Sequence, residues 1–329
     1  MLATKNRPVV SRPALTTTVA REYVHRAALS EVFLTGWSKA GQDAFTVTAQ
    51  WPRSHSFYSS EHGVYDPLLL CETLRQSGLL LTHAAYGTPF GHQLSWSRLR
   101  YAANPQTLRI KSTPAELEMH VLCSDIRYRQ SLPVQMSMHI EVVRDGSRLA
   151  LGDISFGQHS PRVYERIRAG RGDVTRMFAN APAPTPPIPR SVAGRNRDHD
   201  VVLSPAREAP SLVPAQGAGA PGHRRWRLRV DTAHPVLFDH PLDHVPGMLL
   251  LESVRQAGHA LAPSNGAVMP TSMDVSFSRY VEFDDPCWIE AEAEPRATPD
   301  GRRSVRVSAI QGDNRAFAAT AELTDMTAL

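Results

Sequence analysis

The sequence of 329 residues contains only three cysteines, Cys71, Cys123 and Cys287. They are far apart and odd in number, so they match neither a zinc site nor a disulfide framework. No apolar run approaches the roughly 20 residues needed to span a bilayer, and residues 1–7 lack the apolar stretch of a signal peptide. These absences lead us to expect a cytoplasmic protein with no membrane segment.

A formal charge of +4 is compatible with an acidic partner, such as nucleic acid, an acyl carrier protein, or a phosphorylated or CoA-linked substrate. The densest basic run, residues 223–230, alternates Arg with Trp, Leu and Val. This alternation is typical of a half-buried strand with one solvated face. Since no helix-turn-helix or zinc pattern is present either, we expect no nucleic-acid site.

One pattern occurs twice in the chain, in residues 68–76 and 248–256. Each copy places Glu, Arg and Gln at positions i, i+3 and i+4 of an otherwise apolar segment, and a helix brings such positions to one face. A repeat of this kind indicates two related folds in one chain. The repeated polar residues are Glu72, Arg75 and Gln76 in the first copy and Glu252, Arg255 and Gln256 in the second.

The register of the repeat extends to both sides. A histidine precedes each Glu, His55 by 17 residues and His234 by 18. An aromatic-Ser-Arg triplet follows each helix and ends in Arg98 in the first copy and Arg279 in the second. We therefore expect each helix to be embedded in a whole repeated domain.

Both halves have the same predicted order of elements. A short β entry leads to one long apolar helix, over 68–85 and 246–261, and an antiparallel meander follows. In the first half, Asp66-Pro67 is a helix start signal. A helix that is apolar nearly all round must be wrapped. The sequence therefore predicts an α+β double hotdog, in which two tandem hotdog repeats pair as a pseudo-dimer.

We predict a first repeat over 22–160, a linker over 161–222 and a second repeat over 223–329. The linker is rich in Pro and Ala, so we expect it to be extended or partly disordered. Hairpin turns are indicated by Asp145-Gly146, Pro299-Asp300-Gly301 and Gly312-Asp313-Asn314. The expected meander strands are 92–101, 107–113, 117–128, 134–144 and 148–156 in the first half, and 271–283, 287–295, 303–311 and 315–323 in the second.

The segment before the second helix, residues 234–248, is similar to the signature of hotdog dehydratases that act on acyl carrier protein. Pro246-Gly247 opens the helix, so free N–H groups there could polarise a thioester carbonyl. However, His240 precedes Glu252 by 12 residues, about two fewer than in that signature, and Arg255 is foreign to it. Plain dehydration is therefore doubtful.

The whole pattern resembles the AfsA-like hotdog family of A-factor biosynthesis. The resemblance implies transfer of a β-ketoacyl group from acyl carrier protein, or from CoA, to the hydroxyl of dihydroxyacetone phosphate. An aldol-type ring closure then leads to γ-butyrolactone, furan or butenolide signalling molecules. The matching segments are 31–37, 50–58, 66–76 and 238–248.

The repeated residues suit that reaction. The hydroxyl needs a base, which Glu72 or Glu252 could supply, and the oxyanion needs N–H donors, at Gly247 and Met248 or at Leu68. The second copy has the fuller His/Pro-Gly signature, so we place the site there, while Glu72 could contribute opposite His240. Gln76 and Gln256 complete the predicted site, and the guanidinium candidates for the phosphate are Arg75, Arg255, Arg98 and Arg279.

Other interpretations of these residues remain open. Each Glu–Arg pair could be an internal ion pair with a purely structural role. Asp239-His240 with Asp243-His244 could suggest a metal, but no other feature supports one, and we expect no cofactor. The alternative functions are a hotdog thioesterase or dehydratase acting on thioesters, and a non-catalytic binding or regulatory module. The sequence does not distinguish a monomer from a dimer.

Overall fold

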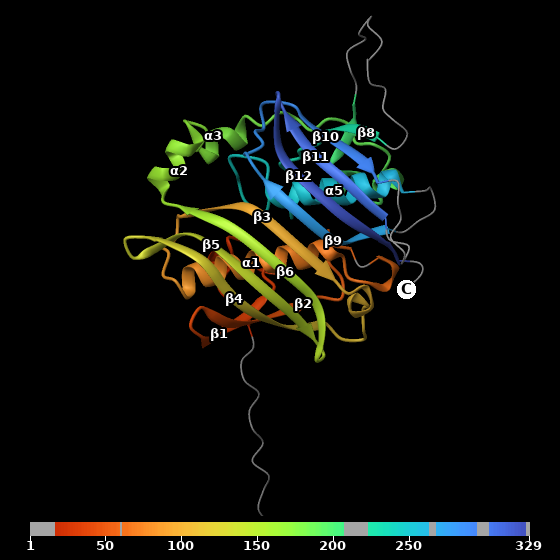
Figure 1. Cartoon of the computed structure of the whole chain (residues 1–329). Coiled ribbons are helices and arrows are strands. Elements are labelled where there is room, and N and C mark those ends of the chain that lie inside the picture. The colour runs from red at the N-terminus through yellow and green to blue at the C-terminus, as the bar shows by residue number, and fades with distance from the viewer. Residues whose placement is uncertain (1–16, 60, 207–222, 263–267, 295–302, 327–329) are drawn as a thin grey trace, which may run out of the picture.

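The described strands form one continuous antiparallel sheet of twelve strands, in the order β1-β2-β4-β5-β6-β3-β9-β12-β11-β10-β8-β7 (Figure 1). The structure is a computed structural model and describes residues 17–59, 61–206, 223–262, 268–294 and 303–326. The first six strands in the chain are β1 (Leu34–Gly41), β2 (Ala44–Trp51), β3 (Gln93–Ala103), β4 (Ala115–Arg129), β5 (Leu132–Arg144) and β6 (Ser147–His159). The others are β7 (Leu203–Pro205), β8 (His223–Leu228), β9 (Val268–Phe277), β10 (Cys287–Ala293), β11 (Arg303–Gln311) and β12 (Asn314–Asp325).

Two long helices lie against this sheet, α1 (Pro67–Ala84) in the first half and α5 (Gly247–Leu261) in the second (Figure 1). Every residue of α1 from Pro67 to His83 is buried except Arg75. Side chains of β4 alternate between buried and exposed, so one face of the strand packs inward and the other meets water. Full burial of each leucine on α1 contributes about 1.5–3 kcal/mol, which explains why the helix is wrapped.

The two halves meet at β3 and β9, where Leu99 pairs with Val275 and Tyr101 with Met273. The strand order is palindromic about this junction, because β3 and β9, β6 and β12, and β5 and β11 occupy matching places. Helices α1 and α5 also contact each other. The predicted double hotdog with merged antiparallel sheets is therefore confirmed.

Local signals in the sequence were accurate at several turns and caps. The Asp66 carboxylate accepts a hydrogen bond from the N–H of Leu68 and so caps α1. Asp145 and Gly146 both have positive φ in the β5–β6 hairpin, and Gly312 has positive φ before β12. The predicted Pro299-Asp300-Gly301 turn lies outside the described residues.

The strand predicted over 107–113 is wrong. Residues Pro105–Leu108 form a 3₁₀ helix instead, because the Asn104 side chain accepts from the Gln106 N–H and proline fixes the first position. The chain then makes only an isolated bridge, between Arg109 and Val64. In the second half β9 ends at Phe277, several residues before the predicted end of that strand.

The expectation of an extended or partly disordered linker is wrong where the chain forms helices, over residues 161–179 and 190–200, whereas residues 181–189 have no helix or strand. Residues 161–205 contain α2 (Pro161–Arg168), α3 (Val174–Ala179), α4 (Arg190–Ala193) and strand β7. This stretch is ordered because it packs: Ile188, Val201 and Leu203 are buried, and β7 pairs with β8. Residues 207–222, the rest of the predicted linker, lie outside the described part. The predicted limits of the repeats remain a prediction.

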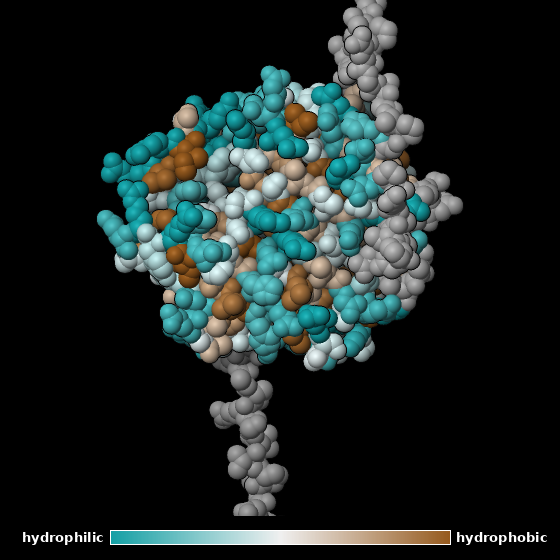
Figure 2. Space-filling view, viewed as in Figure 1, coloured by the Kyte–Doolittle hydropathy of each residue, from teal (hydrophilic) through white to brown (hydrophobic). Residues whose placement is uncertain are grey.

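Figure 2 shows one face of the molecule, on which hydrophilic side chains predominate and apolar side chains form separate small patches. Within the described residues, no helix is long and apolar enough to span a membrane.

Candidate active site

A buried cluster surrounds Glu72 in the middle of α1. Its carboxylate is fully buried and accepts hydrogen bonds from Arg26, from Arg75 and from the Gln76 amide, at 2.7 to 3.0 Å. Burial alone raises the pKa of Glu72, but the charges of Arg26 and Arg75 outweigh it and hold the pKa at about 2. Glu72 is therefore a carboxylate at neutral pH, but both of its oxygens already accept hydrogen bonds from buried donors, so neither is free to take a proton from a substrate hydroxyl.

The second copy builds the same cluster around Glu252 on α5. The carboxylate is fully buried and accepts from Arg195 at 2.6 and 2.9 Å, from Arg255, and from the Gln256 amide. Burial again raises the pKa of Glu252, and Arg195 and Arg255 outweigh it and hold the pKa at about 2. The same physical argument makes Glu252 a poor general base.

Each cluster fixes the backbone of the segment that precedes β1 or β7. Gln76 donates to the Glu31 carbonyl and accepts from the Phe33 N–H. Gln256 does the same with the Asp200 carbonyl and the Val202 N–H. These matched bonds give the two glutamines a structural role, whereas the sequence had placed them in the predicted site.

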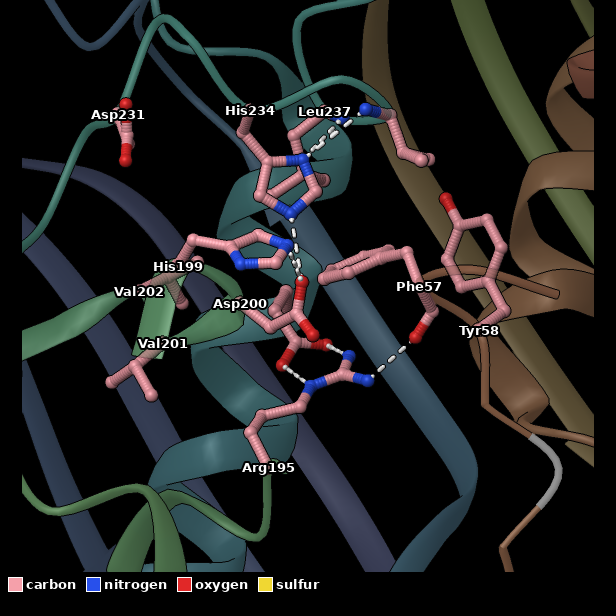
Figure 3. A network of polar contacts seen from close by, with 12 residues as sticks. Phe57, Tyr58, Arg195, His199, Asp200, Val201, Val202, Asp231, His234 and Leu237 are labelled. Carbon is pink, nitrogen blue, oxygen red and sulfur yellow. Dashed lines mark hydrogen bonds and ion pairs between the residues drawn. The ribbon is translucent and has the colours of Figure 1, made fainter. Parts of the chain in front are cut away.

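The two histidines that precede the repeated glutamates, His55 and His234, have matching structural roles as well. His234 Nδ1 accepts from the N–H groups of Val236 and Leu237, while its Nε2 lies 3.3 Å from Asp200 (Figure 3). His55 accepts from two backbone N–H groups in the same way and lies 3.2 Å from Glu31. Each ring therefore holds a loop in place.

His199, Asp200 and His234 bring three potential metal ligands within 4.8 Å of one another. However, His234 Nδ1 is occupied by backbone N–H groups, so the neutral ring carries its proton on Nε2 and donates it to Asp200. A metal would have to displace that proton. Because His55 and Glu31 make the equivalent bond in the first repeat, we interpret the group as a structural hydrogen-bond network.

A cavity of about 1100 Å³ lies between the two repeats. Among the residues predicted for the site, its wall contains Arg75, His240, Gly247, Met248 and Arg279. Two sets of predicted residues lie outside this wall. Five of these six residues belong to the buried clusters around the two glutamates, namely Glu72, Gln76, Glu252, Arg255 and Gln256. The sixth, Arg98, is exposed and forms a bidentate ion pair with Asp274.

The cavity wall includes the N-terminus of α5. Pro246 precedes this helix without a side-chain cap, and Gly247 and Met248 line the cavity. By contrast, α1 begins with a proline, which has no N–H, and the Asp66 carboxylate occupies its next N–H. Within the described residues, the first N–H groups of α5 therefore have no partner, whereas the start of α1 is capped, so of these two helices α5 offers the oxyanion site.

The two clusters also differ in their access to the cavity, because an aromatic ring covers the cluster around Glu252. Arg195 donates to the Phe57 carbonyl and lies 4.3 Å from the centre of the Phe57 ring, which covers it (Figure 3). In the other repeat Arg26 donates to the carbonyl of Val236, a smaller residue that lines the cavity. Arg26 and Arg75 are consequently part of the cavity wall, whereas Arg195 and Arg255 are not.

His240 is connected to the Glu72 cluster. Its Nδ1 lies 2.5 Å from Asp239, whose carboxylate also accepts from the Ala27 N–H and pairs with Arg26. The His240 side chain is 36% exposed, so its other nitrogen can reach a ligand in the cavity. Burial raises the pKa of Asp239, and the bond to His240 and the charge of Arg26 outweigh it, so the net pKa is lowered.

A second aspartate–histidine pair lines the same cavity. His244 Nδ1 lies 2.6 Å from Asp243, which also accepts from the Tyr164 hydroxyl and from Arg168 on α2. Arg168 in turn pairs with Glu282. These contacts attach α2 to the cavity edge. The apolar part of the wall is formed by Leu79, Leu94, Phe156, Leu237, Leu242 and Phe277.

Three residues that contact the buried clusters or His240 are not among those that the sequence predicts for the site: Arg26, Arg195 and Asp239. A short repeated motif could have found the two arginines, because Arg26 precedes Glu31-Val-Phe-Leu by the same five residues as Arg195 precedes Asp200-Val-Val-Leu. The 3₁₀ helices Leu29–Glu31 and Asp198–Asp200 confirm that the two segments correspond. The motif lies partly in the stretch interpreted as a linker, which concealed it.

Comparison with known proteins agrees with this architecture. The family model of the A-factor biosynthesis hotdog domain matches residues 10–157 and 178–327. A Streptomyces virginiae protein named 2-oxo-3-(phosphooxy)propyl 3-oxoalkanoate synthase is 46% identical over 303 residues, which cover 92% of this chain and 96% of the relative. A Streptomyces coelicolor protein of the same name is 40% identical over 90% of this chain and 88% of the relative.

Among solved structures, a Lactobacillus plantarum protein described as an oleoyl thioesterase has a TM-score of 0.50 and 11% identity, and covers 86% of this chain and 96% of its own. That likeness concerns the fold alone. With the family match over both repeats and relatives at 40% and 46% identity along most of its length, the chain belongs to the A-factor biosynthesis hotdog domain family.

Proposed function

We propose that this protein is an acyltransferase that moves a β-ketoacyl group from a thioester to the hydroxyl of dihydroxyacetone phosphate. The product is a 2-oxo-3-(phosphooxy)propyl 3-oxoalkanoate, as in the name of its relatives, and leads to γ-butyrolactone, furan or butenolide signalling molecules. The observation that carries the proposal is the uncapped N-terminus of α5, which faces a cavity shared with His240.

The α5 terminus suits the thioester carbonyl. As the hydroxyl adds to the carbonyl carbon, negative charge develops on the oxygen, and the N–H groups of Gly247 and Met248 would stabilise it. The positive end of the helix dipole acts in the same direction. The apolar wall beside the terminus, which includes Phe277, would hold the acyl chain.

His240 is placed to protonate the thiolate that leaves. Its contact with the Asp239 carboxylate orients the ring towards the cavity. We assign to it the proton that the departing thiolate receives when the carbon–sulfur bond breaks. Glu72 and Glu252, in this proposal, support the fold and take no part in proton transfer.

Arg279 is our candidate for the phosphate of the acceptor. It lines the cavity, and no hydrogen bond or ion pair of its side chain is found among the described residues. A free guanidinium binds a phosphate through paired N–H donors. Arg98 is engaged by Asp274 and Arg255 by Glu252, so neither is available for this role.

The thioester donor, in this proposal, is β-ketoacyl-acyl carrier protein or the corresponding acyl-CoA, and the chemistry requires no cofactor. The cytoplasmic location expected from the sequence would give access to both substrates. The pseudo-dimer within one chain already pairs two hotdogs, so the site is complete in a monomer.

Mass spectrometry of the protein mixed with a β-ketoacyl thioester and dihydroxyacetone phosphate tests the function. Formation of the phosphorylated ester is the expected result, and it should depend on both substrates. Release of free β-keto acid without ester would favour a thioesterase, and an enoyl product would favour a dehydratase. No conversion of any thioester would favour a binding module.

A further inference from the structure

His25 lies at the cavity wall in a backbone conformation that few side chains adopt. Its φ is +49°, in the left-handed region. The matching position of the second repeat is Gly194, with φ +63° and the same place one residue before the cluster arginine. A Cβ at Gly194 would lie 2.5 Å from His259, so only glycine fits there. The first repeat keeps a histidine where glycine would be less strained, which is typical of a functional residue.

The ring of His25 is held by a second histidine. His83 Nδ1 lies 2.7 Å from the Thr88 carbonyl, so this nitrogen carries a proton, and neutral His83 must accept through Nε2. His25 Nε2 lies 2.9 Å from His83 Nε2 and is therefore the donor. Neutral His25 is left with an unprotonated Nδ1, for which the described residues provide no partner.

The charge on His25 agrees with this tautomer. Burial lowers the pKa of His25, and the nearby charges of Arg75, His83 and His240 lower it further, to about 3. The ring is thus neutral at physiological pH, and its Nδ1 remains a hydrogen-bond acceptor.

Arg75 contributes a further hydrogen-bond donor to the same cavity wall. Its Nη2 donates to the carbonyl of Val24, the residue before His25, and its Nε and Nη2 donate to Glu72. No described residue accepts from Nη1. Arg75 is also the one residue of α1 between Pro67 and His83 that is not buried, and it lines the cavity.

We propose that His25 and Arg75 form the subsite for the acyl acceptor, and that they recognise an α-hydroxy ketone. The hydroxyl donates to His25 Nδ1, while the adjacent ketone oxygen accepts from Arg75 Nη1. The inference rests on the proposed acyl transfer and adds to it the residues that select the acceptor. His25 is thereby a further catalytic residue, since it contacts the reacting hydroxyl.

In the proposed transfer, one carbon–oxygen bond forms, one carbon–sulfur bond breaks, and two protons move. The hydroxyl oxygen bonds to the thioester carbon, and its proton passes to His25 Nδ1. A hydroxyl becomes strongly acidic as it adds to a carbonyl, so even a weakly basic imidazole can accept its proton. The carbon–sulfur bond breaks, its electron pair stays on sulfur, and His240 protonates the thiolate. His25 then loses a proton to solvent and His240 regains one.

The test compares His25→Gly with His62→Gly in the full-length protein. His62 also has a positive φ, at +59°, but is exposed and lies outside the cavity wall, so it is a matched control for the backbone change. Gly194 indicates that the fold accepts glycine at the first position. We expect His25→Gly to reduce kcat/KM for dihydroxyacetone phosphate at least about 100-fold and His62→Gly to leave it unchanged.

Two further measurements separate a catalytic from a structural role. Added imidazole should restore part of the activity of His25→Gly, because it can occupy the vacated space. The affinity for a non-hydrolysable β-ketoacyl thioester analogue should stay unchanged. A folded His25→Gly variant with unaltered kcat and acceptor KM would overturn the inference, even if ester formation by the wild type upholds the proposed function. Absence of ester from the wild type would instead refute the proposed function.

Discussion

Arg26 donates a hydrogen bond to the Val236 carbonyl at 3.2 Å, across the boundary between the two repeats. The same guanidinium holds Glu72 on α1 and contacts Asp239, the partner of His240. The open cavity is therefore built from both halves of the chain: the first repeat supplies Arg26 and Arg75, and the second supplies His240 and the N-terminus of α5.

Val236→Phe should close the open site. The matching residue of the first repeat is Phe57, whose ring covers Arg195. A phenylalanine at 236 would project into the cavity, so we expect ester formation to fall at least about tenfold, with a stability cost of about 1–3 kcal/mol from overpacking. Steady-state kinetics and urea unfolding measure the two effects. Val236→Ile is the control, and equal activity of the two variants would contradict the prediction.

Asp239→Asn should impair proton transfer by His240. Asparagine cannot stabilise the imidazolium, so we expect a loss in kcat of about 100-fold, within the usual range for acid–base catalysis. Asp153→Asn is a matched control, because Asp153 lies 2.7 Å from His139 in an exposed pair that is not part of the cavity wall. Comparable losses in both variants would count against a specific role for Asp239.

Glu252→Gln should mainly destabilise the protein. The substitution leaves Arg195 and Arg255 buried without their shared carboxylate. Removal of one partner from a buried ion pair typically costs about 3–5 kcal/mol. Urea unfolding should show this loss, and circular dichroism should show how much protein remains folded. A variant as stable as the wild type would contradict the structural role.

Acidification should destabilise the fold through the two buried glutamates. The pKa of each is about 2 in the folded protein, against 4.5 for an ordinary glutamate. A lowered carboxyl pKa stabilises the folded state fully above pH 4.5, and this stability is lost as the pH falls towards 2. The loss is about 3 kcal/mol per carboxylate.

Urea unfolding at several pH values between about 6 and 3 checks the slope expected from this linkage. Glu252→Gln should lose less stability on acidification than the wild type. Glu165→Gln, a change at an exposed residue of α2, should follow the wild type. Parallel curves for all three proteins would show that the buried glutamates do not set the acid sensitivity.

The fold was predictable because its signals are local or repeated. Asp66-Pro67 caps α1 with groups adjacent in sequence, and Asp145-Gly146 forms its turn alone. The strand wrongly predicted over 107–113 also has a local cause, since Asn104 and Pro105 start a 3₁₀ turn that competes with it.

The site was predictable only in part because its contacts are long-range. The sequence identified His240 and Gly247, which line the cavity, but gave equal weight to the two Glu–Arg clusters. What separates the clusters is a ring from a distant loop: Phe57 lies 138 residues from the Arg195 that it covers. Such a contact follows from the packing of two repeats and has no local sequence signal.

The central claim is that chemistry occurs at His240 and the α5 terminus, while the Glu252 cluster is structural. Mass spectrometry of ester formation by His240→Gln and Glu252→Gln, corrected for the folded fraction of each, tests it most directly. We predict that His240→Gln loses at least about 99% of wild-type turnover, whereas folded Glu252→Gln retains most of it. The opposite pattern, with an active His240→Gln and a folded but inactive Glu252→Gln, would contradict the account and return the general base to Glu252.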